Sequence, residues 1–145
     1  MDKSEAISQA RSIIEKCPFT AFATCDENGF PQSRAMMAAA VDDDLTTYYI
    51  THRGSAKCGQ IAANPNCSSM WMEVVEPMTN WHSVLVKGTA SVKDDKAIRD
   101  RFWMEQLRGF FPGGADDPGF VVVEVKPTEM ILADAQTMPP TVVRM

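Results

Sequence analysis

The strand-forming segments of this chain follow one another mainly through short turns, and this pattern restricts what the chain can fold into. Asn28 and Gly29 form a pair typical of a tight hairpin turn, and three consecutive aspartates at 42–44 turn the chain again, completing a three-stranded meander. Hairpin connections favour a small antiparallel β-barrel over a doubly wound sheet. About seven strands are predicted, over residues 19–25, 30–40, 45–51, 67–75, 81–93, 120–125 and 130–135.

Three helices accompany these strands. The first, residues 4–16, begins with a capping box formed by Asp2 and Glu5. The second covers residues 55–64 and ends before Pro65, and the third runs from Asp94 to about residue 107. Gly88 inside a strand indicates a bulge or a barrel corner. The Gly- and Pro-rich residues 108–119 predict irregular structure, and the tail, residues 136–145, is expected to be extended.

Size and charge limit the classes of function. We expect one domain over residues 1–145. The net charge of −5 argues against a nucleic-acid partner, and no apolar stretch is long enough for a membrane span. Four cysteines without a CxxC pair or zinc-ligand spacing, and only two histidines, predict no metal site. We therefore expect a cytoplasmic protein with reduced thiols.

Residues 49–57, which read YITHRGSAK, carry the most information about function. They predict a strand that passes through a short turn into a helix, and a helix start presents unpaired N–H groups that suit a phosphate. Ser55 adds a hydroxyl group and Lys57 adds a positive charge. The structural alternative is an ordinary N-cap serine followed by a surface lysine.

Two further patterns point to a ligand. Arg34 precedes a run of methionines and alanines, residues 35–40, and small side chains on a strand let a flat ligand lie close to the backbone. Adjacent aromatics in the Gly-rich stretch FFPGG indicate the edge of a ligand or of a partner. Each pattern also fits a structural role: a solvated arginine beside a tight barrel interior, and a loop that folds Phe110 and Phe111 onto its own core.

Taken in order, the motifs GFPQSRAMM, LTTYYITHRGSAK, ANP and VLVKGTASV resemble the FMN-binding split-barrel family related to pyridoxamine 5′-phosphate oxidase. The resemblance covers roughly residues 5 to 135. The later stretch FFPGGADDPGFVVVEVKP is similar to the short, general-stress-protein branch of that family.

The resemblance implies an FMN cofactor and assigns residues to it. Arg34, Ser55 and Lys57 would hold the phosphate and ribityl chain. The strand residues Ala35, Met36 and Met37, with Ile50 and Thr51, would line the isoalloxazine, and Ser83 would touch the flavin from a long strand. The family forms homodimers, so that Trp103, Phe110 and Phe111 are expected to approach a flavin from the second chain.

The chain departs from the true oxidase at three places. Ala56 stands where the oxidase has an arginine directly before the phosphate lysine, and Ala39 stands where it has a lysine at the end of the arginine strand. The C-terminal Arg-x-His substrate motif is absent. Weaker FMN binding and no useful oxidation of pyridoxamine 5′-phosphate are therefore expected.

The sequence hypothesis is a homodimeric FMN-dependent oxidoreductase that acts on a small molecule, with no catalytic residue assigned. The cofactor would supply the redox chemistry, which explains why no strong acid–base pair stands out. The alternative is a non-catalytic protein that stores or senses flavin. A third hypothesis is that the same barrel binds haem or a deazaflavin.

Overall fold

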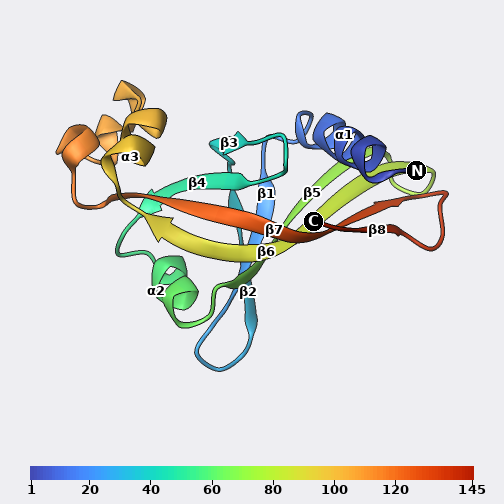
Figure 1. The fold of residues 1–145 in the computed structure, drawn as a ribbon, viewed down its shortest axis with the longest axis horizontal. Coiled ribbons are helices and arrows are strands. Elements are labelled where there is room, and N and C mark those ends of the chain that lie inside the picture. The colour runs from blue at the N-terminus through green and yellow to red at the C-terminus, as the bar shows by residue number, and fades with distance from the viewer.

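The computed structural model describes residues 1–145 as a mainly β protein with three α-helices (Figure 1). The helices are α1 (Lys3–Ile14), α2 (Ala56–Ala63) and α3 (Lys96–Phe102), followed by the 3₁₀ turns η1 (Glu105–Gly109) and η2 (Gly114–Asp116). The strands are β1 (Thr20–Cys25), β2 (Pro31–Met36), β3 (Ala40–Val41), β4 (Thr47–His52), β5 (Asn66–Glu76), β6 (Asn80–Lys93), β7 (Phe120–Asp134) and β8 (Thr141–Arg144).

The strands form one antiparallel sheet that curls round on itself. The order is β2-β1-β5-β6-β7-β4-β3, with β8 added on β7. Although three strands separate β1 from β4 in this order, Phe22 of β1 and Tyr49 of β4 lie with ring centroids 4.7 Å apart in a shared buried cluster. The β2 and β3 edges are not hydrogen-bonded to each other, so the antiparallel barrel remains split. The predicted fold class is confirmed.

The predicted three-stranded meander is wrong. β4 pairs with β7 rather than with β2, and the predicted strand over residues 30–40 stops at Met36. The Ala39 N–H donates to the Tyr48 carbonyl at 2.7 Å, and β3 then pairs with β4. The segment therefore leaves one edge of the sheet and joins the other, which one continuous strand does not do.

The last two predicted strands are one strand, β7, so the predicted break at Lys126 and Pro127 is wrong. The register of β6 against β7 shifts between Lys87 and Gly88, opposite Pro127 and Glu129. A Cβ on Gly88 would lie 2.4 Å from the Lys126 carbonyl oxygen, which leaves room for glycine alone. The bulge expected at Gly88 is thus confirmed, and it accommodates a proline inside a long strand.

The N-terminal end of the chain forms α1, and the C-terminal tail adds a strand, β8, to the sheet. The capping box of α1 is confirmed, because Glu5 N–H donates to Asp2 at 2.8 Å and Asp2 N–H donates to Glu5 at 3.1 Å. The tail is not merely extended, since β8 pairs with β7 and brings the number of strands to eight.

None of the helices is both long and apolar enough to cross a membrane.

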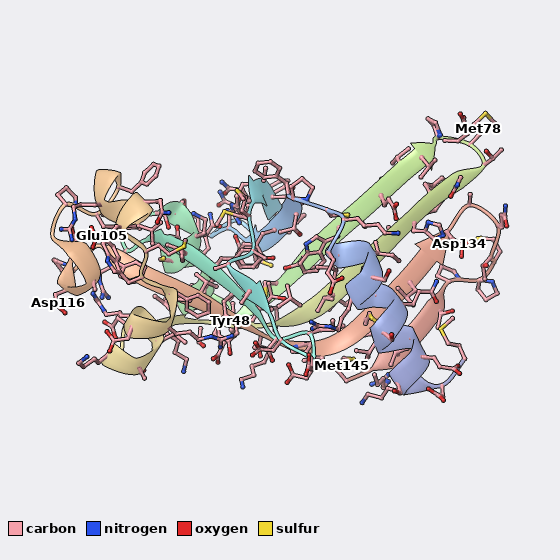
Figure 2. The ribbon with its side chains drawn as sticks, turned by 90° about the horizontal axis from the view of Figure 1, so that it is seen from above. Tyr48, Met78, Glu105, Asp116, Asp134 and Met145 are labelled. Atoms are coloured by element: carbon pink, nitrogen blue, oxygen red, sulfur yellow. The ribbon has the colours of Figure 1, made fainter.

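The third helix is shorter than predicted. Asp95, rather than Asp94, caps α3, and the helix ends at Phe102, so that residues 105–109 form a separate 3₁₀ turn. Asp94 instead binds Arg53 at 2.7 Å. Figures 1 and 2 place α3 and these turns at one end of the long strands, with α1 and the β5–β6 hairpin at the other. The α3 end carries the main cleft of the molecule.

Candidate functional site

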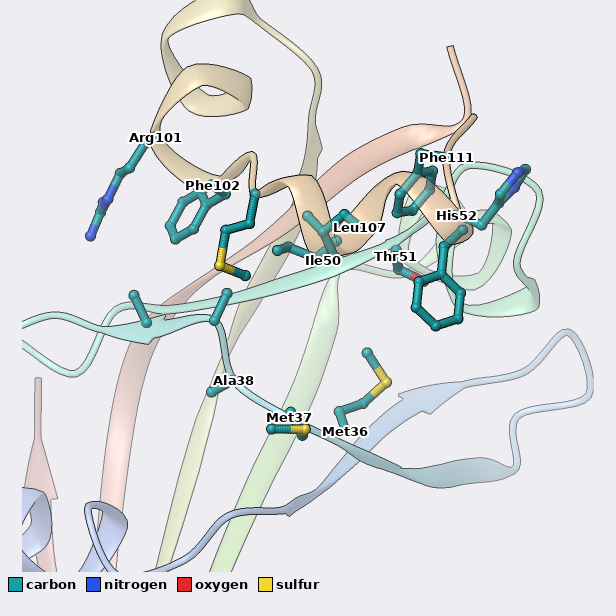
Figure 3. A pocket seen from close by; sticks show the side chains of 14 residues that line it. Met36, Met37, Ala38, Ile50, Thr51, His52, Arg101, Phe102, Leu107 and Phe111 are labelled. Atoms are coloured by element: carbon teal, nitrogen blue, oxygen red, sulfur yellow. The ribbon is translucent and has the colours of Figure 1, made fainter. Parts of the chain in front are cut away.

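An open, mostly apolar cleft of about 840 Å³ lies between the β2–β3 connection, β4 and the segment that follows α3 (Figure 3). Most of its lining side chains are hydrophobic, and the polar exceptions are Thr51, His52 and Arg101. The lining residues are Met36, Met37, Ala38, Ala39, Ala40, Ile50, Thr51, His52, Arg101, Phe102, Met104, Leu107, Phe110 and Phe111.

One wall of the cleft is the methionine and alanine run that follows Arg34. In Figure 3, Met36, Met37 and Ala38 lie on one side of the cleft, facing Ile50 and Leu107 on the other. Methyl side chains at positions 38–40 keep this wall close to the backbone. Met36 and Met37 add flexible, polarizable surface. Such a wall suits one face of a planar, apolar group.

The facing wall is closed by the cap, which we define as residues 103–119. The Asp117 carboxylate accepts hydrogen bonds from the Gly113 and Gly119 N–H groups, each at 2.8 Å. These bonds lower the Asp117 pKa. Arg99 of α3 donates to the carbonyls of Ala115 and Asp117 at 3.0 and 2.9 Å. The cap is therefore held by its own backbone and by α3, although it contains little regular structure.

A cationic group adjoins the cleft where β4 passes into α2. Lys57 Nζ donates to Thr51 Oγ1 at 2.9 Å, and Thr51 Oγ1 lies 3.3 Å from Ser55 Oγ. Ser55 is the N-cap of α2, but its side chain makes no capping hydrogen bond. Its hydroxyl instead contacts Cys58 Sγ at 3.4 Å. Because Thr51 also lines the cleft, the lysine and the apolar walls belong to one continuous site.

Arg34 of β2 is held beside this group by neutral partners. Its Nη1 donates to Thr24 Oγ1 at 2.8 Å and to the Phe22 carbonyl at 3.3 Å. Its Nη2 donates to Gln60 Oε1, on α2, at 3.2 Å. The guanidinium carbon lies 6.0 Å from the Phe22 ring centroid. β1, β2 and α2 thus fix the arginine together.

Neither cation is neutralised by the protein. No ion pair in the chain includes Arg34 or Lys57. Burial lowers the pKa of Arg34, and burial followed by repulsion from Arg34 lowers the pKa of Lys57. Two half-buried positive charges that repel each other beside an apolar cleft have the chemistry to attract an anionic group attached to an apolar one.

The structure brings most of the residues predicted from the sequence together. Met36, Met37, Ile50 and Thr51 line the cleft. Ser55 and Lys57 do not line it but adjoin it through Thr51, and Arg34 lies close enough to Lys57 to lower its pKa. Phe110 and Phe111 line the cleft of their own chain, Phe110 being 75% exposed and Phe111 buried. Their predicted approach to a flavin in a second chain stays a prediction.

Besides Arg34, Ser55 and Lys57, three further predicted residues lie outside the cleft of their own chain. Ala35 sits in a shallow depression with Phe19 and Met70. Ser83 is buried on β6, where it pairs with Met72 and Ala133. Figure 2 places the neighbouring Asp134 at the end of the molecule opposite the cap.

Trp103 is the third of these residues. It packs edge-on against Phe120, with ring centroids 5.4 Å apart, and its Nε1 donates to Glu105 at 3.2 Å. It therefore supports the base of the cap rather than the cleft wall. A contact of Trp103 with a ligand bound by another chain is still only a prediction.

Sequence reasoning missed the neutral partners of Arg34, and it missed Met104 and Leu107 among the cap residues that line the cleft. Gln60 follows Lys57 by three positions on the same short helix, and this spacing places both side chains on one helix face. That spacing was the available signal. No local pattern indicated Thr24, which reaches Arg34 only because β1 and β2 pair.

The chain matches the model of the pyridoxamine 5′-phosphate oxidase family over residues 7–133. It therefore belongs to that family. It is 30% identical over 109 residues to general stress protein 26 of Bacillus subtilis (strain 168), a match covering 75% of each chain.

Solved structures share the fold. The general stress protein 26 of Bacillus anthracis str. Sterne superposes with a TM-score of 0.76 at 23% identity, covering 97% of this chain and 99% of that one. A heme binding protein from Mycobacterium smegmatis superposes with a TM-score of 0.75 at 14% identity, covering 96% of this chain and 57% of that one. At these identities the similarity concerns the fold alone.

Proposed function

We propose that this protein is an FMN-binding flavoprotein and an oxidoreductase that acts on a small molecule. The observation that carries the proposal is the pair of unneutralised cations, Arg34 and Lys57, at the end of an apolar cleft. FMN has the matching composition, a planar ring system joined to a dianionic phosphate. The residues present therefore fit this cofactor, and membership of the pyridoxamine 5′-phosphate oxidase family supports the choice.

In this proposal each part of the site has a separate task. Lys57, Arg34 and the Ser55 hydroxyl hold the phosphate, helped by the first N–H groups of α2. The wall of residues 36–40 supports the ring, and the cap excludes water from its other side. FMN, when bound, supplies the electron or hydride transfer, while the protein contributes position and electrostatics.

We further propose a homodimer in the cytoplasm. β5 presents Met72, Val74 and Val75 with exposed fractions of 53%, 51% and 66%. Exposed apolar side chains that adjoin one another are typical of protein–protein interaction sites. A second copy of the chain is the partner that the family resemblance indicates. The four free cysteines fit a reducing compartment.

The test of cofactor and activity is an absorption spectrum of the purified protein, followed by anaerobic addition of NADH or NADPH. A flavin spectrum that bleaches supports the oxidoreductase. A flavin spectrum that persists with both donors but bleaches with a chemical reductant, the positive control, favours the alternative of non-catalytic flavin binding. Absence of FMN binding in a titration would overturn the proposal.

The dimer has its own test. Light scattering at micromolar concentration is expected to give about twice the 16.0 kDa chain mass. A monomer that still binds FMN would contradict a site shared between two chains.

Haem is the second ligand to test, because a structural neighbour is a heme binding protein. His52 is the histidine that lines the cleft, and its Nδ1 accepts the Gly54 N–H at 3.2 Å. In the neutral ring this places the proton on Nε2, where it blocks coordination to iron. The geometry therefore favours flavin. A Soret band after incubation with hemin, lost in His52→Ala, would reverse that preference.

A further inference from the structure

The hydrogen bonds of Arg34 involve only uncharged acceptors, and this is unusual for a half-buried arginine. Thr24 Oγ1, the Phe22 carbonyl and Gln60 Oε1 accept from its two terminal nitrogens. Buried arginines are commonly paired with carboxylates, which cancel their charge. Here the contacts fix the guanidinium without cancelling its charge.

Gln60 is the centre of this arrangement. Its Oε1 accepts from Arg34 Nη2 at 3.2 Å and also from the Thr24 hydroxyl, which itself accepts from Arg34 Nη1. On its other side, Gln60 Nε2 donates to Gln32 Oε1 at 2.8 Å. An amide that donates at one end and accepts at the other has a defined orientation. Gln32 therefore keeps the oxygen of Gln60 turned toward Arg34.

These bonds leave part of the guanidinium free. Both hydrogens of Nη1 and one of Nη2 have partners, whereas Nε and the remaining hydrogen of Nη2 have none within the chain. Nε and Nη2 form one edge of the planar group, and two parallel donors on such an edge match two oxygens of a phosphate.

We propose that Gln60 is a positioning residue that orients Arg34 while leaving its full positive charge available to the phosphate of the ligand. This inference rests on the proposed FMN function and deepens it. It predicts that Gln60 controls the preference for phosphorylated over unphosphorylated flavin. A carboxylate of the same shape at position 60 would still accept the hydrogen bond from Arg34. It would also form an ion pair with Arg34 and repel the phosphate.

The test compares Gln60→Glu with the wild-type protein in titrations with FMN and with riboflavin, which lacks the phosphate. FMN affinity is expected to fall about tenfold or more, the effect of losing one charge-assisted contact. Riboflavin affinity should stay within about twofold, since its binding involves no phosphate charge. A purely structural role for Gln60 would weaken both ligands equally, and that result would overturn the inference.

Two matched variants complete the design. Gln32→Glu adds the same charge one hydrogen bond further from Arg34, so a smaller loss of FMN affinity is expected, and it serves if Gln60→Glu does not fold. Gln136→Glu adds the charge to the exposed β7–β8 turn and should change neither affinity. Equal effects at positions 32 and 136 would also overturn the inference.

Failure of the proposed function looks different from failure of this inference. If the wild-type protein binds no FMN, both are overturned. If it binds FMN and Lys57→Ala weakens that binding, but Gln60→Glu keeps the wild-type preference for FMN over riboflavin, only the role of Gln60 is overturned.

Discussion

Arg101 and Arg34 are both close to the cleft, but they differ in whether the protein neutralises their charge. Arg101 of α3 binds the Asp42 carboxylate at 2.9 Å and lies 4.6 Å and 4.7 Å from the ring centroids of Tyr48 and Phe102. The Asp42 hydrogen bond raises its pKa. Arg34 has neutral partners only, and burial lowers its pKa. One charge is used within the protein to join α3 to the sheet, and the other remains available to a ligand.

The largest expected effect concerns substrate choice. Because Arg101 is already paired with Asp42, and Ala39 of the same cleft supplies no charge, the cleft offers no clamp for a dianionic substrate. FMN-loaded protein should therefore fail to oxidise pyridoxamine 5′-phosphate, since the positioning that a clamp provides contributes several kcal/mol, about 7 or more in favourable cases. Pyridoxal phosphate and peroxide formation under air is the measurement. Turnover of about one per second or faster would mean that Arg101 or another cation does bind the substrate phosphate.

The next effect concerns the Arg34 end. Lys57→Ala or Arg34→Ala should each weaken FMN binding about tenfold or more, because a charge-assisted contact to phosphate contributes roughly 1.5–3 kcal/mol. Riboflavin affinity should change much less. Lys96→Ala is a matched control, because that lysine is exposed on α3 and pairs with Asp100. Unchanged FMN affinity in either variant would remove the phosphate from this end of the cleft.

The parts of the site that could be predicted from the sequence are those whose residues are close together along the chain. Lys57, Ser55 and Thr51 are near neighbours in one strand–turn–helix segment, so their proximity is readable from spacing. Arg34 joins them only through the curling of the sheet, and the family resemblance, not the spacing, connected it to them. Thr24 had no local signal at all, because its partner is set by the register of β1 against β2.

The fold shows the same division. The capping box of α1 and the bulge at Gly88 depend on local chemistry and were predicted. The partner of β4 was not, because a strand that follows a hairpin usually pairs with it, whereas here residues 37–39 carry the chain to the opposite edge. β8 forms because β7 leaves an edge free for the tail, which no local pattern in residues 136–145 records.

A smaller effect tests the electrostatics of the unpaired end by pH. Burial, then repulsion from Arg34, lowers the Lys57 pKa below its ordinary value of 10.5 in the folded state. Between the lowered value and 10.5 the unfolded chain holds more protons at this group, so its contribution to the free energy of unfolding rises with pH. Flavin-free wild-type protein should therefore gain stability relative to Lys57→Met as the pH rises toward 10.5, measured by denaturant titration. A difference that stays flat or moves the other way would show that Lys57 is not destabilised by its surroundings.

The smallest effect is expected at Arg101, and it is the strictest test of the comparison between the two arginines. Arg101→Met keeps an unbranched side chain that can pack beside Tyr48 and Phe102, but removes the guanidinium that lies over their rings and pairs with Asp42. Both partners of the ion pair are more than one-third exposed, and such pairs contribute about 1 kcal/mol or less. FMN affinity should stay within about twofold, because this charge is already satisfied inside the protein and lies at the end of the cleft away from Thr51 (Figure 3).

The free energy of unfolding should fall by no more than about 1 kcal/mol, and an Asp42→Asn variant should reproduce that loss. A drop in FMN affinity as large as that of Arg34→Ala would mean that the phosphate lies at the α3 end, and that charge pairing within the protein does not distinguish the two arginines.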